Sequence, residues 1–418
     1  MISKLKLSTR SLSSQRMTLL KQMRKNRPQI SIQSKQLLVD VSAIIQEDTH
    51  TGIQRVVRAL LVQLFTNPPE GYQVLPVFCT REHGYRYADS VFVHKFISDN
   101  NKISTDVVVN SKDIFFGLDL AARFLPLHKK QLLNWKLQGV KIHILVYDML
   151  PHLHPEWFTS RSVKNFHRWL STISVYSDQL ICISNSVKNE LREWLCNQNF
   201  SIHTPRIATI PLGCEIASSM PSTGMDNQIA DMLESLKKKK FILMVGTIEP
   251  RKGYDDALKA MKTFWDSGED ITLVIVGKTG WKTVKLQERL LSHPQQGSKL
   301  FWLKNVSDQV LQKLYEMANV VLVTSYGEGF GLPIVEAIYY TKPLLVRDIP
   351  VFREVVYGYK NIEYFSDDNM LVSKLKSQLQ NPQKNLESEF HGSTWYESVL
   401  RLNALFLANQ QKSSFNDK

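Results

Sequence analysis

The strongest constraint on the fold of this chain is a short glycine turn between an apolar run and a proline. Residues 320–323 are Val-Val-Leu-Val, a run typical of a buried strand, and residues 328–336 read Glu-Gly-Phe-Gly-Leu-Pro-Ile-Val-Glu. Glycines permit a tight turn, and Pro333 suits the first position of a helix, where a missing N–H costs little. The order strand, turn, helix is typical of open α/β sheets, which bind ligands where their strands end.

Two acidic residues frame this predicted ligand position. Glu328 lies in the turn and Glu336 on the helix that follows. Ionised carboxylates only accept hydrogen bonds, so this pair suits a ligand rich in hydroxyl groups. The alternative is that the glycines only shape a turn and that Glu336 is a solvated helix residue.

A second motif follows the apolar run at residues 241–245. It reads Gly-Thr-Ile-Glu-Pro-Arg-Lys-Gly and places Arg251 and Lys252 at a glycine turn before a predicted helix. Adjacent cations at the start of a helix suit a diphosphate. The alternative is two ordinary basic residues on a surface turn.

Together the two motifs resemble those of retaining glycosyltransferases of the GT-B fold, family four of the sugar-transferase classification. The resemblance covers about residues 37–408. It implies an α/β chain with two Rossmann-like domains that face a central cleft, and a nucleotide-sugar donor bound mainly by the second domain. The donor-binding residues that it implies are Gly52, Arg251, Lys252, Phe330, Gly331, Leu332 and Glu336, with Glu336 on the nucleotide ribose.

The resemblance also implies the catalytic residues Asp148, Arg251, Lys252 and Glu328. Asp148 either orients the sugar or accepts the proton of the acceptor, and a role as a loop or capping residue is the alternative. Gly52 is equally well explained as the start of a helix. Two positions depart from the family pattern: Tyr147 stands where relatives often have histidine, and Thr247 stands where many have arginine.

The implied reaction is transfer of a hexose to a hydroxyl group with retention of anomeric configuration. The segments around residues 51–58 and 245–253 resemble bacterial mannosyltransferase-like enzymes of surface polysaccharide assembly, including O-antigens. GDP-mannose is therefore the first expectation for the donor, and a glycan or lipid-linked glycan for the acceptor. The alternatives are a nucleotide-sugar epimerase, a phosphorylase of the same fold, or a non-catalytic sugar-binding relative.

No metal or other cofactor is expected. The chain has no Asp-x-Asp motif, and His152 and His154 have no third metal ligand in view. Nucleic-acid binding is not expected either, because no known binding module follows the basic N-terminal segment.

The net charge of +13 is concentrated near the N-terminus. Residues 1–39 contain nine lysines and arginines and no acid, so the remainder carries about +4. This tail is either a solvated extension or a contact with anionic lipid, in which each cation contributes ~1 kcal/mol. We expect a cytoplasmic protein for three reasons. The four cysteines are scattered, no secretory signal is visible, and no apolar run approaches the ~20 residues needed to cross a membrane. The tail would place it peripherally at the inner membrane face.

The pattern of apolar runs and breaks divides the chain into five segments, and the resemblance implies the role of each domain and the return of the last helix. The segments are a basic tail (1–36), an N-terminal acceptor domain (37–214), a linker (215–238), a C-terminal nucleotide-sugar domain (239–390) and a C-terminal helix that returns to the first domain (391–418). Predicted strands include residues 37–41, 73–78, 141–147, 180–183, 241–245, 271–276, 300–303, 320–323 and 343–347, whereas residues 80–112 are polar and predicted to be irregular.

Overall fold

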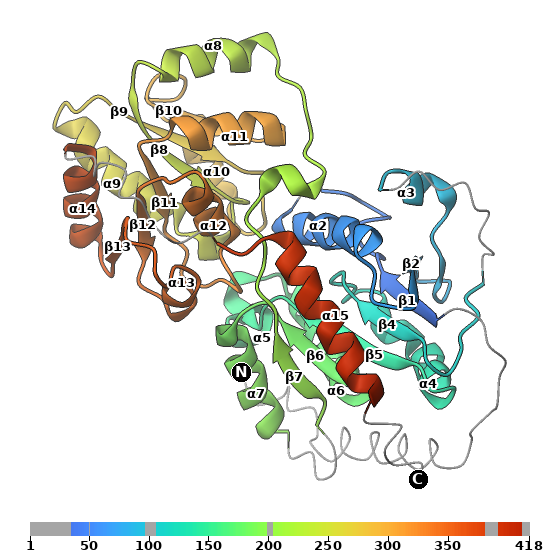
Figure 1. Cartoon of the computed structure of the whole chain (residues 1–418). Coiled ribbons are helices and arrows are strands. Elements are labelled where there is room, and N and C mark those ends of the chain that lie inside the picture. Colours follow the sequence, from blue (N-terminus) through green and yellow to red (C-terminus); the bar gives the residue numbers. More distant parts are fainter. Residues whose placement is uncertain (1–34, 50, 97–105, 199–203, 381–391, 412–418) are drawn as a thin grey trace. The chain divides into compact units, whose positions relative to one another are not determined.

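The computed structural model describes residues 35–49, 51–96, 106–198, 204–380 and 392–411 (Figure 1). The chain divides into two compact units. Unit 1 takes the described residues up to Leu153, then Ser160–Leu212 and the chain from Trp395, and unit 2 takes His154–Thr159 and Gly213–Thr394. The predicted basic tail lies outside the described residues, apart from Lys35 and Gln36 at the start of the first strand.

Unit 1 is built on a seven-stranded sheet in the order β3-β2-β1-β4-β5-β6-β7. Only β3 is antiparallel to its neighbour within this described sheet. The strands are β1 (Lys35–Asp40), β2 (Tyr72–Phe78), β3 (Arg86–Tyr87), β4 (Ile114–Gly117), β5 (Lys141–Val146), β6 (Gln179–Cys182) and β7 (Arg206–Thr209). The strand order reverses between β1 and β4, which makes this the topological switch point of the sheet.

Seven α-helices surround this sheet in the described part of unit 1. They are α2 (Gly52–Thr66), α3 (Ser90–His94), α4 (Lys129–Leu137), α5 (Leu150–Leu153), α6 (Ser160–Tyr176), α7 (Asn185–Cys196) and α15 (Trp395–Gln411), with the short 3-10 helix η2 at Leu125–His128. Helix α15 packs beside α2, and Asn403 Nδ2 donates to the backbone oxygen of Asn67 at 2.9 Å. The Phe406 ring lies edge-on to Phe116 of β4 with centroids 5.1 Å apart.

Unit 2 is built on a six-stranded parallel sheet in the order β10-β9-β8-β11-β12-β13. The strands are β8 (Lys240–Val245), β9 (Ile271–Val276), β10 (Leu300–Leu303), β11 (Val320–Val323), β12 (Leu344–Arg347) and β13 (Ile362–Phe365). The helices are η3 (Pro155–Trp157), η4 (Ile216–Ser219), α8 (Asn227–Leu236), η5 (Pro250–Lys252), α9 (Tyr254–Asp266), α10 (Val284–Leu291), α11 (Asp308–Met317), α12 (Leu332–Tyr339), α13 (Pro350–Val355) and α14 (Asp368–Gln380). Here the order reverses between β8 and β11.

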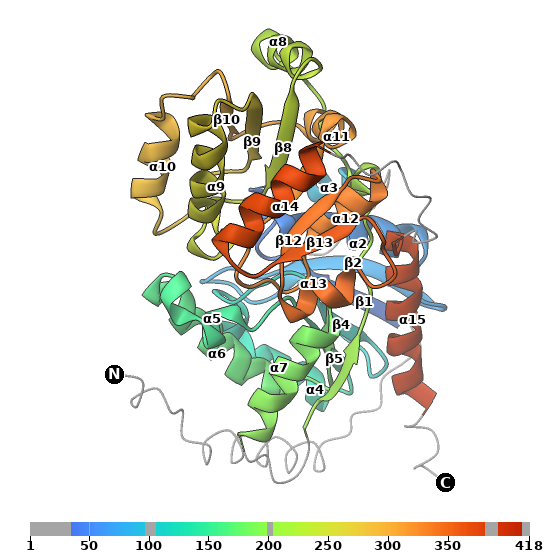
Figure 2. The same cartoon turned by 90° about the vertical axis from the view of Figure 1, so that its left-hand side faces the viewer.

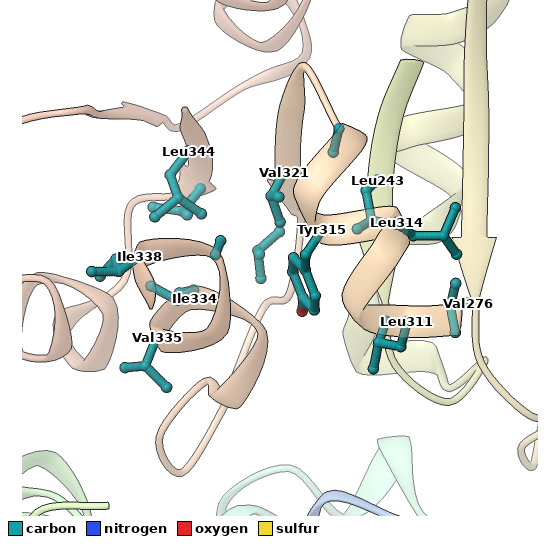
Figure 3. Packing of buried hydrophobic residues seen from close by; sticks show 14 of the residues in the cluster. Leu243, Val276, Leu311, Leu314, Tyr315, Val321, Ile334, Val335, Ile338 and Leu344 are labelled. Carbon is teal, nitrogen blue, oxygen red and sulfur yellow. The ribbon is translucent and has the colours of Figure 1, made fainter. Parts of the chain in front are cut away.

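Helices cover both faces of the unit 2 sheet. Helices α9 and α14 lie side by side on one face (Figures 1 and 2), and α11 and α12 pack on the other (Figure 3). The alternation of side chains along β8 connects the two cores, since Leu243 joins the α11–α12 core while Ile242 and Met244 join the α9–α14 core. This double cover explains why the strands read as continuous apolar runs.

The predicted fold class, an α/β chain with two Rossmann-like sheets, is confirmed. Two segments differ from the sequence prediction. Residues 215–238, predicted as a linker, contain η4 and α8, and Leu233 and Leu236 of α8 are buried in the core of unit 2. Residues 80–112, predicted to be irregular, contain β3 and α3. No helix in the described ranges has the length and apolar character needed to cross a membrane.

Candidate functional site

The loop after β8 carries the two predicted phosphate-binding cations. Residues Pro250–Lys252 form the short helix η5, and Gly253 then starts α9 with a φ of +65°. A Cβ atom at Gly253 would lie 2.3 Å from the backbone oxygen of Thr324. Glycine is therefore required both by the left-handed backbone and by the close approach of the loop that follows β11.

Hydrogen bonds tie these two loops together. Thr324 Oγ1 donates to the backbone oxygen of Lys252 at 2.7 Å. The backbone N–H of Tyr326 donates to the backbone oxygen of Arg251, also at 2.7 Å. Arg251 Nη1 donates in return to the backbone oxygen of Gly327 at 3.0 Å. The loops after β8 and β11 are thus joined at the position where the strand order reverses, which is where such sheets bind ligands.

Charged side chains from both loops meet at this junction. The carboxylate of Glu328 lies between two cations, with Arg251 Nη1 2.5 Å from Oε2 and Lys252 Nζ 2.5 Å from Oε1. Ser325 Oγ also donates to Glu328 Oε1 at 2.8 Å, and Arg251 Nε donates to Glu249 Oε2 at 2.9 Å. The side chains of Arg251, Lys252 and Glu328 are 16%, 12% and 9% exposed, so these ion pairs are only partly screened by water.

The protonation state of Glu328 follows from this geometry. Burial raises its pKa, but the charges of Arg251 and Lys252 and their hydrogen bonds outweigh burial and lower the pKa to about 2. Near neutral pH the group is therefore a carboxylate, which accepts hydrogen bonds and has no proton to donate. Glu328 is suited to hold a hydroxyl group or a cation rather than to act as a general acid.

A second charged cluster braces the loop after β11, and sequence reasoning missed it. Arg347 ends β12, and its Nη2 lies 2.5 Å from Oδ2 of Asp256 on α9. Tyr326 Oη donates to the same Oδ2 at 2.5 Å, and Arg347 Nε donates to the backbone oxygen of Thr324 at 3.0 Å. The Arg347 guanidinium also lies 4.1 Å from the centroid of the Tyr326 ring. The sequence did contain one signal for this cluster, because Arg347 is a charged residue at the carboxyl end of a buried strand.

The start of α12 holds the remaining donor-site candidates of unit 2. Gly331 has a φ of +103°, and a Cβ atom there would lie 3.0 Å from the Phe352 ring. Its neighbours Phe330 and Leu332 are half-buried. Glu336 is 2% exposed and accepts a hydrogen bond from Tyr315 Oη at 2.7 Å, so it is not the solvated helix residue of the alternative interpretation.

The other candidates belong to unit 1. Asp148 follows β5, and its Oδ1 accepts from the backbone N–H of Leu150 at 3.0 Å, as a residue at the start of a helix does. Tyr147 is buried and donates to the backbone oxygen of Leu118 at 2.8 Å, which makes it a core residue. Gly52 opens α2 behind Thr51, whose side chain forms a capping box with Gln54.

The structure therefore brings Arg251, Lys252 and Glu328 into one cluster, with Glu336 on the helix that follows. It places Asp148 and Gly52 in the other unit. Binding and catalytic roles for these residues stay predictions.

Comparison with known proteins connects this geometry to a family. Residues 226–390 match the family described as Glycosyl transferases group 1. The serotype-specific mannosyltransferase WbdA of Escherichia coli is 36% identical over 338 residues, which cover 80% of this chain and 40% of WbdA. The O-antigen chain mannosyltransferase RfbU of Salmonella typhimurium is 27% identical over 214 residues, which cover 51% of this chain and 54% of RfbU. The chain thus spans about two fifths of the length of WbdA.

Two solved structures share the fold over most of the chain. HepE of Anabaena, in complex with UDP and glucose, has a TM-score of 0.57 and 15% sequence identity, covering 92% of this chain and 100% of HepE. The sucrose-phosphate synthase of Thermosynechococcus elongatus has a TM-score of 0.59 and 15% identity, with the same two coverages. At these identities the likeness concerns the fold.

Proposed function

We propose that this chain, whose residues 226–390 match the family described as Glycosyl transferases group 1, transfers a hexose from a nucleotide-sugar donor. The acceptor is a hydroxyl group of a glycan or of a lipid-linked glycan, and the anomeric configuration is retained. The observation that carries this proposal is the meeting of Arg251 and Lys252 with Glu328 at the switch point of the unit 2 sheet. The two cations suit the diphosphate of a sugar diphosphate, and the carboxylate suits its sugar, whose hydroxyl groups can donate hydrogen bonds to it.

Each residue of this cluster has a proposed role. Arg251 and Lys252 bind the diphosphate and stabilise the charge that it gains as it leaves. Glu328 and the backbone N–H groups at residues 330–332 hold the transferred sugar, and Glu336 holds the ribose. No metal is needed for this charge balance, because the two side chains supply the positive charge.

The proposed reaction follows from the same charges. The bond between the anomeric carbon and the diphosphate oxygen breaks first, and positive charge develops on the sugar. The acceptor oxygen then forms the new bond on the face that the leaving group occupied, and its proton passes to the leaving phosphate. Asp148 of unit 1 is proposed to orient the reacting sugar or the acceptor.

Mannose is the proposed sugar and GDP-mannose the proposed donor. The relatives WbdA and RfbU are named mannosyltransferases, and RfbU acts on the O-antigen chain by its name. A surface polysaccharide under assembly is therefore the proposed acceptor.

A donor panel tests the proposal. GDP-mannose, GDP-fucose, UDP-glucose and UDP-N-acetylglucosamine are incubated with the protein, with and without a mannose-terminated glycan, and nucleotide release is measured. We expect release from GDP-mannose that depends on the acceptor, and proton NMR of the product should show the α-anomeric configuration of the donor. Release without acceptor would indicate an epimerase or hydrolase, and no release from any donor would contradict transfer.

We also propose a cytoplasmic enzyme whose basic N-terminal tail contacts the inner face of the membrane. The tail combines nine cations and no acid with Leu12, Leu19, Leu20 and Met23. Both features favour a surface of anionic lipid. This contact would bring the enzyme to a lipid-linked acceptor.

A further inference from the structure

A hollow of about 520 Å3 lies at the carboxyl end of the unit 1 sheet, and none of its lining residues is used by the proposed function. Its walls come from the loops that follow β1, β2 and β4, and they consist of Gln46, Thr80, Arg81, Glu82, His83, Arg123 and Phe124. Since the strand order of unit 1 reverses between β1 and β4, the hollow lies at the switch point, where open α/β sheets place their ligands.

Buried hydrogen bonds hold these three loops in place. Asp40 at the end of β1 accepts from the backbone N–H of Ser42 at 2.9 Å and from Tyr85 Oη at 2.7 Å. Asp119, after β4, accepts from the backbone N–H groups of Ala43 and Ile44 at 2.8 and 2.7 Å. The loop after β1 is therefore anchored to both of its neighbours.

Two of the lining residues, Gln46 and Thr80, are held by further contacts. Gln46 Nε2 donates to the backbone oxygens of Ser42 at 2.7 Å and Cys79 at 3.2 Å. Thr80 Oγ1 accepts from the backbone N–H of His83 at 3.1 Å, which closes the turn that carries Arg81. Because the loops are already ordered, ligand binding costs entropy mainly in the arginine side chains that they carry.

The charges of the hollow select the class of ligand. Arg81 and Arg123 are exposed, and neither side chain forms an ion pair or hydrogen bond with any residue that the structure describes. Glu82 is the one acidic lining residue, so the two guanidinium groups outnumber it. Guanidinium groups bind phosphate and carboxylate in a two-pronged manner. The half-buried Phe124 adds an apolar wall of the kind that the C–H face of a sugar ring can cover.

We infer that this hollow binds an acidic group of a saccharide, either a sugar phosphate or a uronic acid, through Arg81 and Arg123. Naming this saccharide as the acceptor rests on the proposed function, whereas the anion site itself does not. The acceptor selected by this chain is then an acidic glycan, and the acidic group is bound in unit 1 rather than by the diphosphate-binding cations of unit 2.

The test measures binding of two anionic probes and one neutral probe by isothermal titration calorimetry and NMR. The probes are mannose 6-phosphate, glucuronic acid and methyl α-mannoside, at constant ionic strength. The variants are Arg81→Gln, Arg123→Gln and the double variant. Arg161→Gln is the matched control, because Arg161 is exposed on α6, belongs to unit 1 and does not line the hollow. Lys252→Ala controls for binding of the phosphate probe at the unit 2 site.

We expect at least one anionic probe to bind the wild type more tightly than the neutral probe does. Each single variant should weaken that binding by roughly tenfold, as expected for loss of a charge-assisted contact. Arg161→Gln should leave it unchanged, and Lys252→Ala should remove only the binding of the phosphate probe that occurs at the unit 2 site. Selective binding of mannose 6-phosphate identifies a phosphate, and selective binding of glucuronic acid identifies a uronate.

Equal binding of the anionic and neutral probes, or unchanged anion binding in the double variant, would overturn the inference. Thermal unfolding of each variant checks that the fold is retained. Because the readout is binding, the anion site can stand even if no donor yields transfer. Transfer can likewise stand if the site fails, since nucleotide release with a neutral acceptor does not require Arg81 or Arg123.

Discussion

Arg251 and Lys252 are already paired with carboxylates, so any phosphate that they bind has to compete with Glu328 and Glu249. The competition is favourable for a diphosphate, because it carries more negative charge than one carboxylate and offers more acceptor oxygens. Glu328 would then be released toward the hydroxyl groups of the sugar. At the residue scale, donor binding is therefore an exchange of ion pairs.

Lys252→Ala and Arg251→Ala should each lower kcat/KM for the donor by roughly 10- to 150-fold, the equivalent of about 1.5–3 kcal/mol for a hydrogen bond to a charged group. The measurement is nucleotide release at subsaturating donor. Lys262→Ala is the control, because this lysine is 70% exposed on α9 and pairs with Asp266 four residues away. Near-wild-type turnover in both site variants would contradict the phosphate-binding role.

Local spacing was enough to single out Arg251, Lys252 and Glu328 as candidates, because each follows a strand within one short loop. It could not predict the contact between the two loops, which depends on residues more than seventy positions apart. For the same reason Arg347 and its partners Asp256 and Tyr326 were missed. Each of these side chains looks unremarkable in the sequence, and only the parallel order of β8, β11 and β12 brings them together.

At the scale of elements, the Arg347 cluster joins β12, α9 and the loop after β11. The side chains of Arg347 and Asp256 are 12% and 8% exposed, so removing one partner leaves a charge in a poorly solvated place. Lys259 Nζ lies 3.7 Å from Asp256 Oδ1 but is itself largely exposed, and it offers a weak substitute. The cluster holds the loop that carries Glu328.

Arg347→Met should destabilise the protein by about 3 kcal/mol, because it leaves the buried Asp256 carboxylate without its main partner. It should also lower kcat, since the loop bearing Glu328 loses its anchor. Urea unfolding and nucleotide release measure the two effects. The double variant Arg347→Met, Asp256→Leu should recover part of the stability but not the activity. Additive losses in the double variant would show that the pair does not act as a unit.

Helix α15 is held to the unit 1 sheet partly through a buried histidine. His143 of β5 is fully buried, and its ring meets Phe406 edge-on with centroids 5.2 Å apart. Neither ring nitrogen has a hydrogen-bond partner among the residues that the structure describes. Burial lowers the pKa of His143 from 6.5 to about 4, so the native state holds the imidazole neutral.

The protein should therefore lose stability as the pH falls from 6.5 to 4. The unfolded chain takes up a proton at the ordinary pKa, whereas the folded chain takes it up only near the lowered pKa. The total for this group is about 3 kcal/mol. Urea unfolding between pH 4 and pH 7 should show a shallower loss in His143→Leu. His94→Leu is the control, because His94 is exposed on α3. An identical pH profile in wild type and His143→Leu would contradict this assignment.

Elements with continuous apolar runs were predictable to the residue: β9, β10 and β11 begin and end where the sequence indicated. The edge strand β13 was missed because its first three residues are half-exposed, so no buried run marks it. Helix α8 was missed because Ser, Gly and Lys near it suggested a linker, while Leu233 and Leu236 are buried by tertiary contacts that the local pattern does not show.

At the scale of the whole molecule, the basic tail carries most of the excess positive charge of the chain. Its proposed contact with anionic lipid is electrostatic, so it should weaken as screening shortens to ~3 Å at 1 M ionic strength. Residues 1–34 precede β1, so a truncation at this point removes none of the described helices and strands.

A variant lacking residues 1–34 should lose binding to vesicles that contain anionic lipid while keeping transfer to a soluble acceptor. Co-sedimentation at low salt compares the two proteins, and neutral vesicles and 1 M salt serve as controls. If the full chain and the truncated chain sediment equally, or if neither sediments, the tail is a solvated extension.

The position of α15 also affects how the protein is made. This helix contributes Phe406 and Trp395 to unit 1, yet the ribosome completes it only after all of unit 2 has been translated. At 5–20 residues per second the interval between Leu212 and Trp395 is roughly 10–40 s. During that time unit 1 of the nascent chain lacks helix α15 and the buried side chains that this helix contributes. Unit 2, whose main segment is continuous from Gly213 to Thr394, can complete its folding first although its sequence comes second.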